Sequence, residues 1–333
     1  MTPVGGHLAV LLAVLLFGTI SNPGVLVDRE AYVMDTRVRL VTTAVTRADG
    51  LASLERALGV LEATEAELST WIADSALSRV NRAPVGRPYQ VDASACVLLG
   101  ELAKWQRETG GTFDPAIGRL LEAWDVHGSG RVPTDAELTR ARSASGFDRL
   151  GFEASDCTVT RTTDVLVDVG GFGKGEAIDR AARAFGENAW LIDLGGQVSA
   201  WAGSHSTGWP VSVAHPLSRD RAHLNVTIRH GSVSTSGRSE RDRMVAGIAV
   251  SHILDPRTGH PSSFTGSVTV WHERALIADI LSTALFVMGP EEGMRWAAKR
   301  GLGVCYQVPS SHGATRVLMT PAFRTAVLSS NQR

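Results

Sequence analysis

Residues 167–179 read VDVGGFGKGEAID, and this stretch is the clearest indication of how the chain folds. The apolar residues around it predict a strand over 165–169 and a helix over 176–185, with a glycine-rich turn between them. Such a turn lets backbone N–H groups and a helix N-terminus approach phosphate oxygens, and Lys174 adds a positive charge. The stretch therefore predicts a phosphate-binding turn, although a tight strand-to-helix turn with a solvated lysine fits the same residues.

The turn differs from the two common phosphate-binding motifs. A Walker A loop has a glycine where this chain has Asp168, and a serine or threonine where it has Gly175. The dinucleotide motif GxGxxG fails because Glu176 stands at the third glycine position. Neither nucleotide-binding family is therefore indicated.

On either side of residues 167–179, helical and strand-like segments alternate without an internal repeat. A strand is predicted over 36–45, followed by a helix that opens at Asp49 and keeps helical spacing through Ile72. Asp92 is placed to cap a helix that ends at two glycines, and Thr134 with Glu137 predicts a capping box. Further strands are predicted at 190–194, 211–214, 224–228 and 268–272, and a further helix at 275–288. These elements predict an α+β protein with mixed sheets and packed helices in one compact unit.

A second group of polar residues lies at 251–261, which reads SHILDPRTGHP. The pairs Asp255-Pro256 and Thr258-Gly259 initiate turns. His252 ends an apolar stretch, so it is either a general base that points into a site or a core histidine with satisfied hydrogen bonds.

A third candidate lies inside the apolar helix predicted at 275–288. Asp279 and Thr283 are four residues apart and so share one helix face. A carboxylate with hydroxyl and carbonyl oxygens suits a hard cation such as Mg²⁺. An exposed polar stripe on an amphipathic helix is the alternative.

Composition excludes some functions and leaves location open. The 333 residues carry a formal net charge of -1 and no run of Lys and Arg, so nucleic acid is a poor candidate partner. The cysteines at 96, 157 and 305 stand far apart, and buried free thiols are expected.

Residues 8–20 form an uncharged apolar run, shorter than the roughly 20 residues of a membrane-spanning helix. We expect residues 1–25 to be an export signal or a membrane anchor, with an apolar tail on a cytoplasmic protein as the alternative.

From residue 34 to about 293 the sequence resembles the ApbE family. Eight blocks carry the resemblance in family order: MDT (34–36), STWIADSALSRVN (69–81), TGGTFDPAIG (109–118), VDVGGFGKGEAID (167–179), LIDLGGQV (191–198), STSG (234–237), HILDPRTGHP (252–261) and ADILSTALFVMG (278–289). The resemblance implies an ApbE-like, T-fold-related domain over 30–333 that transfers FMN from FAD to a threonine of another protein and releases AMP.

The same resemblance implies roles for individual residues. FAD would be lined by Met34, Trp71, Thr112, Phe113, Asp114 and Lys174, with His252 and Ile253 closing over it. Mg²⁺ would be held by the backbone carbonyls of Gly173 and Ser282 and the side chains of Asp279 and Thr283. The catalytic residues would be His252, as the base, and Asp168, which would lie beside the metal site as an indirect ligand or an orienting group.

Two positions depart from the family pattern. Asp35 replaces the usual glycine of Met-Gly-Thr, which places a carboxylate near the expected flavin, and Gly173 replaces the usual alanine before the lysine. An FAD pyrophosphatase that yields FMN and AMP, or a carrier that binds FAD without catalysis, are the alternatives to a transferase. As a transferase, the protein would act in the cell envelope, exported or membrane-anchored, on an acceptor that belongs to a membrane redox system. A cytoplasmic location would change that partner.

Overall fold

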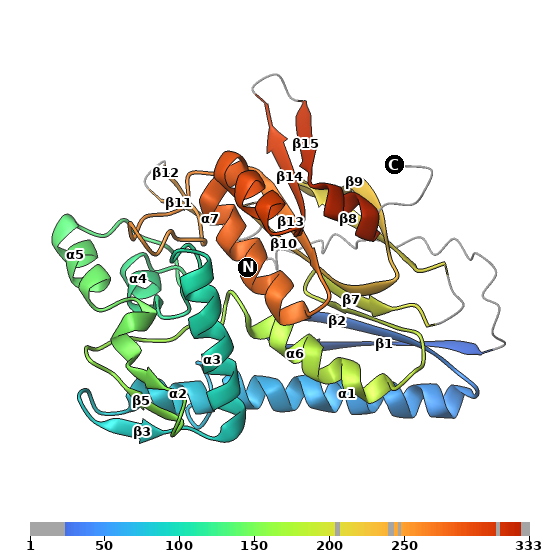
Figure 1. Cartoon of the computed structure of the whole chain (residues 1–333), viewed down its shortest axis with the longest axis horizontal. Coiled ribbons are helices and arrows are strands. Elements are labelled where there is room, and N and C mark those ends of the chain that lie inside the picture. The colour runs from blue at the N-terminus through green and yellow to red at the C-terminus, as the bar shows by residue number, and fades with distance from the viewer. Residues whose placement is uncertain (1–23, 204–206, 239–242, 246–247, 311–313, 328–333) are drawn as a thin grey trace, which may run out of the picture.

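Eight strands form the central sheet of the computed structural model, which describes residues 24–203, 207–238, 243–245, 248–310 and 314–327 (Figure 1). Every neighbouring pair in this sheet is antiparallel. In spatial order the strands are β1 (Val25–Val33), β2 (Thr36–Ala44), β6 (Trp190–Leu194), β7 (Gln197–Trp201), β10 (His230–Gly237), β13 (Ser267–His272), β14 (Gly303–Pro309) and β15 (Thr315–Met319).

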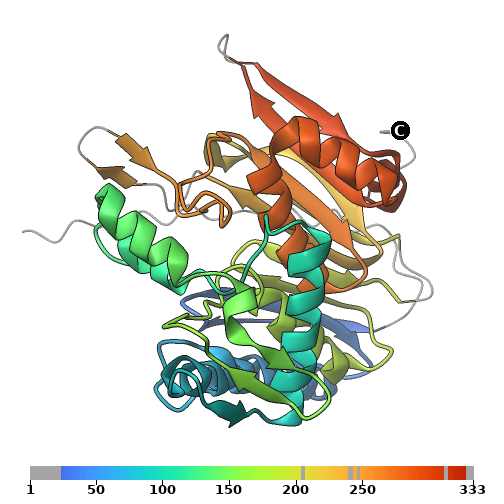
Figure 2. The same cartoon turned by 60° about the vertical axis from the view of Figure 1, so that its left-hand side comes forward.

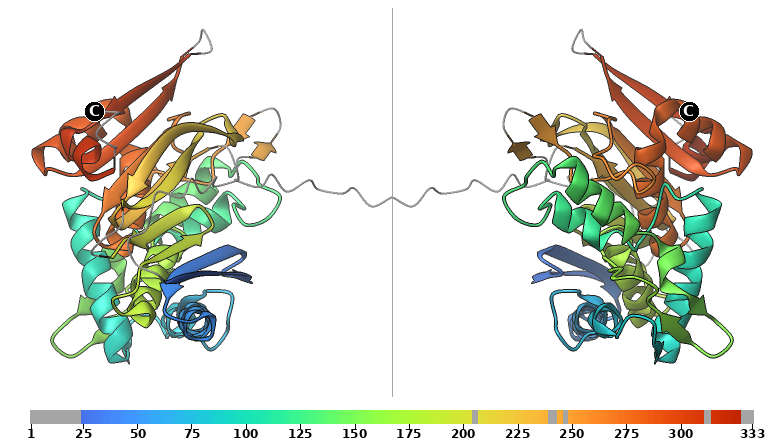
Figure 3. Two further views of the ribbon diagram at one scale, coloured as in Figure 1. Left: turned by 90° about the vertical axis from the view of Figure 1, so that its right-hand side faces the viewer. Right: turned by 90° about the vertical axis from the view of Figure 1, so that its left-hand side faces the viewer.

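Apolar and polar side chains alternate along the strands of this sheet, and helices cover the face on which the apolar ones lie. Val38 and Leu40 of β2 pack against the long helix α1 (Arg47–Leu68) and against α6 (Gly173–Ala181). Helix α1 lies beneath the β1–β2 hairpin (Figure 3). The helix α7 (Ala275–Lys299) contacts β10, β13 and α6, and it bends at Gly289, where φ is 74° and a proline follows.

The other sheet face packs against a separate hairpin. Strands β8 (Trp209–His215) and β9 (Ser218–Ile228) form a two-stranded sheet whose apolar side chains join Val41 and Val198 of the central sheet in one core cluster. Phe323 of the short helix α8 (Pro321–Val327) belongs to the same cluster. The segment that follows Gly293 therefore completes the fold.

A lobe of short helices stands at one end of the sheet (Figures 1 and 2). Its core includes Leu77, Leu99 and Phe147, and it joins the rest of the molecule through Leu276 and Ile280 of α7. The lobe contains α2 (Ala76–Arg82), α3 (Ala93–Glu108), α4 (Gly118–Ala123), α5 (Asp135–Ser143), the 3₁₀ turn η1 (Phe147–Leu150) and the small strands β3 (Pro88–Gln90), β4 (Phe152–Glu153) and β5 (Thr158–Thr160). Elsewhere, β11 (Arg243–Val245) pairs with β12 (Ile248–Val250), and the 3₁₀ turn η2 (Ala182–Phe185) follows α6.

The structure confirms the α+β class and most of the predicted elements. Thr46 caps α1 by accepting the N–H of Asp49, Asp92 caps α3 through Ala95, and Thr134 and Glu137 form the expected capping box. Two predictions were wrong. The first helix ends at Leu68, so Ile72 lies in the turn before α2.

The second error concerns residues 165–169, which are not a strand. The side chain of Asn81 donates to the carbonyl of Val167 and accepts its N–H. Gly118 donates to the carbonyl of Leu166, and Asp168 donates to that of Pro115. Loops and a side chain therefore satisfy this backbone, and no neighbouring strand is needed.

The prediction of three free thiols was also wrong for two of them. Cys96 on α3 and Cys157 beside β5 form a disulfide with Cα atoms 5.3 Å apart, because the lobe brings together residues separated by 61 positions. Cys305 is a buried free thiol, and burial raises its pKa to about 12.

The apolar run at 8–20 lies outside the described residues. Within the described ranges, no helix has the length and apolar character needed to cross a membrane.

We expect loss of the disulfide to destabilise the protein. Replacing both Cys96 and Cys157 by alanine should lower the free energy of unfolding by about 3 kcal/mol, because the bond restricts the unfolded chain over a long loop. Urea denaturation measures the change. A reductant should weaken the wild type by a similar amount and leave the double variant unchanged; equal stability of the two proteins would contradict the structural role of the bond.

Candidate active site

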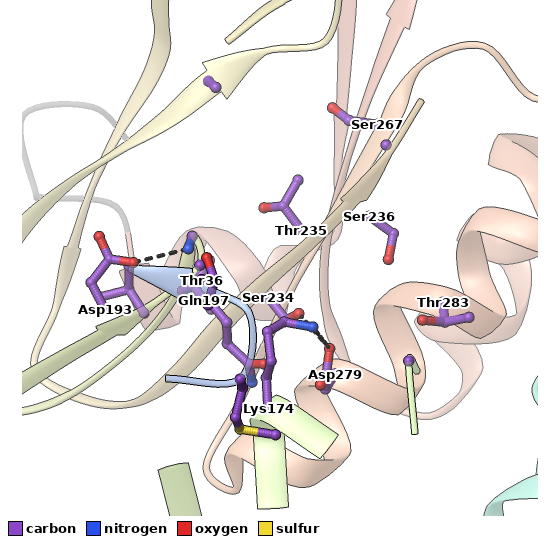
Figure 4. Close-up of a pocket in the computed structure, with 18 of the residues that line it drawn as sticks. Thr36, Lys174, Asp193, Gln197, Ser234, Thr235, Ser236, Ser267, Asp279 and Thr283 are labelled. Carbon is purple, nitrogen blue, oxygen red and sulfur yellow. Dashed lines mark hydrogen bonds and ion pairs between the residues drawn. The ribbon is translucent and has the colours of Figure 1, made fainter. Parts of the chain in front are cut away.

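A cavity of about 920 Å³ lies between the α6 turn, the central sheet and the β8–β9 hairpin. Lys174, Thr36, Gln197, Asp279 and Thr283 contribute to its wall from four different elements, α6, β2, β7 and α7 (Figure 4). The predicted phosphate-binding turn and the predicted metal-binding helix therefore border one space, although they are about a hundred residues apart in sequence.

The two helices meet closely because Gly175 has no side chain. A Cβ atom at this position would lie 2.4 Å from the carbonyl oxygen of Ala275, which is too close for any other residue. Asp179, one turn along α6, accepts the N–H groups of Ala275 and Leu276 at 2.6 and 3.2 Å. Burial raises the pKa of Asp179, and these two backbone donors oppose the rise. Residues of the 167–179 stretch thus fix the start of α7.

This packing brings Asp279 to the glycine-rich turn at 170–175. Its side chain accepts the N–H of Gly175 at 3.0 Å through Oδ2, and its Oδ1 lies 3.6 Å from Nζ of Lys174. Asp279 is only 3% exposed, which excludes an exposed polar stripe on this part of α7. Lys174 is paired with a buried carboxylate and is not a freely solvated lysine.

Hydroxyl groups surround the same carboxylate. Ser234 Oγ lies 3.3 Å from Asp279 Oδ1 and 3.2 Å from Ser282 Oγ, and Ser236 Oγ lies 2.9 Å from Ser282 Oγ. Among the described residues, no three His, Cys, Asp or Glu side chains are grouped to hold a metal ion. Any cation here would therefore rely on one carboxylate with hydroxyl and carbonyl oxygens, a set that fits Mg²⁺.

The predicted metal-binding residues lie together around α6 and α7. Thr283 lines the cavity, and its Oγ1 would be 3.6 Å from a Cβ built at Gly171. Gly173 begins α6, and a Cβ there would meet Met34 and Val169 at 3.4 and 3.3 Å. Met34 therefore lies in contact distance of the turn at Gly173, and Met34 itself lines the cavity.

Asp168 is tied to two neighbours at the edge of the cavity. Its Oδ1 accepts the N–H of Gly170 at 2.8 Å, and its Oδ2 lies 3.4 Å from Nε2 of His127. The ring of Trp71 packs edge-on against His127, with ring centroids 5.3 Å apart, and Trp71 is 75% exposed. Trp71 does not itself line the cavity, but it packs on His127, which does; an exposed indole in this place suits a planar ligand that covers it.

His252 and Ile253 also line the cavity. The loop that carries them is closed by backbone bonds from Ser262 to Ile253 and from Gly259 to Asp255, and by the ion pair of Arg257 with Asp255 at 2.8 Å. The turn formers predicted at 255–259 thus hold His252 at the cavity.

The block at 112–114 lies elsewhere. Thr112, Phe113 and Asp114 are at most 7% exposed, and none of them lines the cavity. Asp114 accepts the N–H groups of Ala116 and Phe147 at 2.8 and 3.0 Å. Burial raises its pKa, while these backbone donors act in the opposite direction. In the described geometry Asp114 fixes a loop, and Phe113 supports the turn from behind, against Gly171.

Several cavity residues were missed by the sequence reading. His127, Asp193, Gln197, Ser234 and Ser236 carried no motif by themselves. Asp193, Gln197 and both serines belong to blocks quoted for the family resemblance, and that was the only available signal. His127 lies in a stretch, WDVHGSG, that sequence reasoning did not single out.

Asp35 occupies a constrained backbone position. With Met34 it forms the two-residue turn between β1 and β2, and both residues have positive φ values, 53° and 55°. Turns of this kind favour glycine or asparagine, so an aspartate here is held in a backbone conformation that side chains rarely adopt. The carboxylate lines the cavity and accepts the hydroxyl of Tyr32 at 3.0 Å.

Comparison with known proteins gives a consistent result. A model of the ApbE family matches residues 34–306. The chain is 30% identical to an FAD:protein FMN transferase of Klebsiella pneumoniae over 305 residues, which is 88% of this chain and 87% of that protein. It is also 30% identical to an FAD:protein FMN transferase of Vibrio cholerae, over 76% of this chain and 78% of that protein.

Solved structures agree with this result. The ApbE protein of Thermotoga maritima superposes with a TM-score of 0.83 at 28% identity, covering 90% of this chain and 99% of that one. The flavin transferase ApbE of Vibrio cholerae superposes with a TM-score of 0.80 at 26% identity, covering 91% of this chain and all of that one.

Proposed function

The chain belongs to the ApbE family, and we propose that it is an FAD:protein FMN transferase that uses Mg²⁺ and attaches FMN to a threonine hydroxyl of an acceptor protein. The observation that carries this proposal is the buried Asp279 carboxylate beside Lys174 and a glycine-rich turn, inside a cavity large enough for a dinucleotide. A carrier that only stores FAD has no need of a buried carboxylate with oxygen donors around it.

Each part of the site has a role in the proposed reaction. The turn at 170–175 and Lys174 bind the diphosphate of FAD and offset its negative charge. Trp71 and His127 border the place for the planar flavin. His252 accepts the proton of the acceptor hydroxyl as its oxygen bonds to the phosphorus of FMN, and the bond to the AMP phosphate breaks.

The residues fit a divalent cation at α6 and α7. Asp279 and Thr283 would hold it through their side chains, and Gly173 and Ser282 through their carbonyls. When bound, Mg²⁺ stabilises the charge that develops on the diphosphate oxygens during transfer. Asp168, held by Gly170 and His127, orients the turn that faces this place.

Mass spectrometry tests the proposed reaction. An acceptor domain incubated with this protein, FAD and Mg²⁺ should gain the mass of one FMN on a threonine, with AMP released in equal amount. Release of AMP and free FMN without an adduct would instead indicate a pyrophosphatase. Intact FAD after incubation with several acceptors would indicate a carrier.

We further propose that the protein acts in the cell envelope on an acceptor of a membrane redox system. The Cys96–Cys157 disulfide supports this location, because such bonds persist in oxidising compartments. The apolar run at 8–20 would serve as export signal or membrane tether. Fractionation of cells that produce the tagged protein would test the location, and recovery of the protein in the cytoplasm would contradict it.

Asp35 should weaken FAD binding. We expect Asp35→Gly to lower the dissociation constant of FAD about fivefold, because a carboxylate near the anionic diphosphate repels it by about 1 kcal/mol in a solvated cavity. Isothermal titration calorimetry measures the change. Tyr32→Phe is the matched control, since it removes the hydroxyl bonded to Asp35 and keeps the charge. Unchanged or weaker binding by Asp35→Gly would show that this charge has no effect on FAD.

A further inference from the structure

Strand β8 presents its edge to the cavity. All residues from Trp209 to Pro216 border the cavity. Successive side chains of a strand point to opposite faces, so a space that touches every residue lies along the strand edge. On its other edge β8 pairs with β9, from Trp209 opposite Ile228 to His215 opposite Ser218.

Alternate residues of β8 direct their backbone groups away from β9. Pro210 has no N–H, and a proline within a strand is tolerated where the N–H position faces outward. The carbonyl of Ala214 accepts Nε2 of Gln307, which lies on β14 and not on β9. Ser212 lies between these two, so its N–H and C=O point outward as well. Among the described residues, no backbone hydrogen bond joins Ser212 to any segment other than β9.

The floor of the cavity beside this edge is a row of cross-strand neighbours on the central sheet. Glu30 of β1 is opposite Arg39 of β2, Arg39 is opposite Asp193 of β6, and Asp193 is opposite Val198 of β7. The charged side chains of this row alternate in sign, from Glu30 to Arg39 to Asp193. Nε of Arg39 is buried without a hydrogen-bond partner among the described residues, so this floor has donor capacity to spare.

A series of contacts connects the edge of β8 to the proposed site of FMN transfer beside Asp279. Ala214 is bonded to Gln307, and Gln307 is bonded to Ser267, which also lines the cavity. Ser267 is opposite Gly237 on β10, next to Ser236, whose hydroxyl contacts that of Ser282 beside Asp279. A chain that follows β8 toward Ala214 is thereby directed to the site of transfer.

We propose that the acceptor protein inserts an extended segment along the free edge of β8, as a third strand of the β8–β9 sheet. This inference rests on the proposed transferase function. A strand occupies about 5 Å beside its neighbour, and its backbone would pair with the outward groups of Ser212. One face of the segment would meet the charged row, and its threonine, near Ala214, would reach the diphosphate held at Lys174.

Removal of the outward N–H of Ser212 tests this proposal. We expect Ser212→Pro to raise the KM for the acceptor about tenfold, with kcat and FAD affinity unchanged, because a hydrogen bond of the docked strand is lost. Ser212→Ala is the matched control, since it loses only the hydroxyl that donates to Asn225 and keeps the N–H. Wild-type kinetics for Ser212→Pro would overturn the proposal, as would an equal rise in KM for Ser212→Ala.

A second measurement uses the wild-type enzyme, so that folding of a variant does not matter. Acceptor peptides carrying a single N-methyl group at successive backbone positions should lose transfer at every second position, because alternate amides of a strand face its neighbour. Equal loss at all positions, or none at any, would overturn the docking mode. If the unmodified acceptor receives no FMN at all, the proposed function fails, and the two failures are distinguishable.

Discussion

Asp279→Asn should reduce the rate of FMN transfer about 1,000-fold. The asparagine keeps the shape of the side chain and an oxygen for the N–H of Gly175, but it removes the charge that would bind the cation and pair with Lys174. A bound cation contributes several kcal/mol to a phosphoryl-type transfer, and about 4 kcal/mol corresponds to a factor of about 1,000. Transfer to an acceptor under saturating FAD and Mg²⁺ measures the loss.

A binding measurement separates loss of the cation from loss of the fold. With FAD present, Mg²⁺ should raise the melting temperature of the wild type and leave that of Asp279→Asn unchanged. Ser234→Ala serves as control, since it removes one hydroxyl beside Asp279 Oδ1 without changing the charge, and we expect it to retain at least a tenth of the activity. Transfer by Asp279→Asn at a tenth of the wild-type rate or more would remove this residue from the metal site.

His252→Ala should lower the transfer rate about 100- to 10,000-fold while FAD still binds. The residue lines the cavity from a loop closed by its own hydrogen bonds, so truncation leaves the loop in place. The expected loss is that of a positioned general base. Single-turnover kinetics with preloaded FAD measure it apart from binding.

His260 provides the matched control for His252. It lies in the same loop, is exposed, packs against the ring of Trp124 and does not line the cavity. His260→Ala should therefore transfer FMN at close to the wild-type rate. Added imidazole should restore part of the activity of His252→Ala, because it supplies a base in the vacated space. Full activity of His252→Ala without imidazole would show that another group accepts the proton.

The sequence was informative where chemistry depends on near neighbours. The glycines around Lys174, the caps at Asp92 and Thr134, and the apolar character of α7 act within a few residues, and the predicted caps and helices are present. The resemblance also grouped residues that the structure brings to one cavity, among them Met34, Lys174, Asp168, His252 and Asp279.

The errors arose where a segment has partners far away in the sequence. Residues 165–169 have the composition of a strand, but Asn81 occupies their backbone groups. Cys96 and Cys157 show no pairing signal at a separation of 61 residues, and the lobe joins them. The role of Asp114 in FAD binding stays a prediction; in the described loops its carboxylate accepts the N–H groups of Ala116 and Phe147.

Local properties of the sequence, namely period, caps and glycine spacing, predicted the class of fold, the glycine-rich turn before α6 and the position of Asp279 in an apolar helix. The tertiary contacts decided that Gly175 brings this helix within reach of the turn, and that β8 borders the cavity with an edge that pairs with no other strand among the described residues. Both features depend on the order of strands in the sheet and on contacts between segments about a hundred residues apart. No local pattern encodes such contacts, since their free energy is gained only when the whole core is packed.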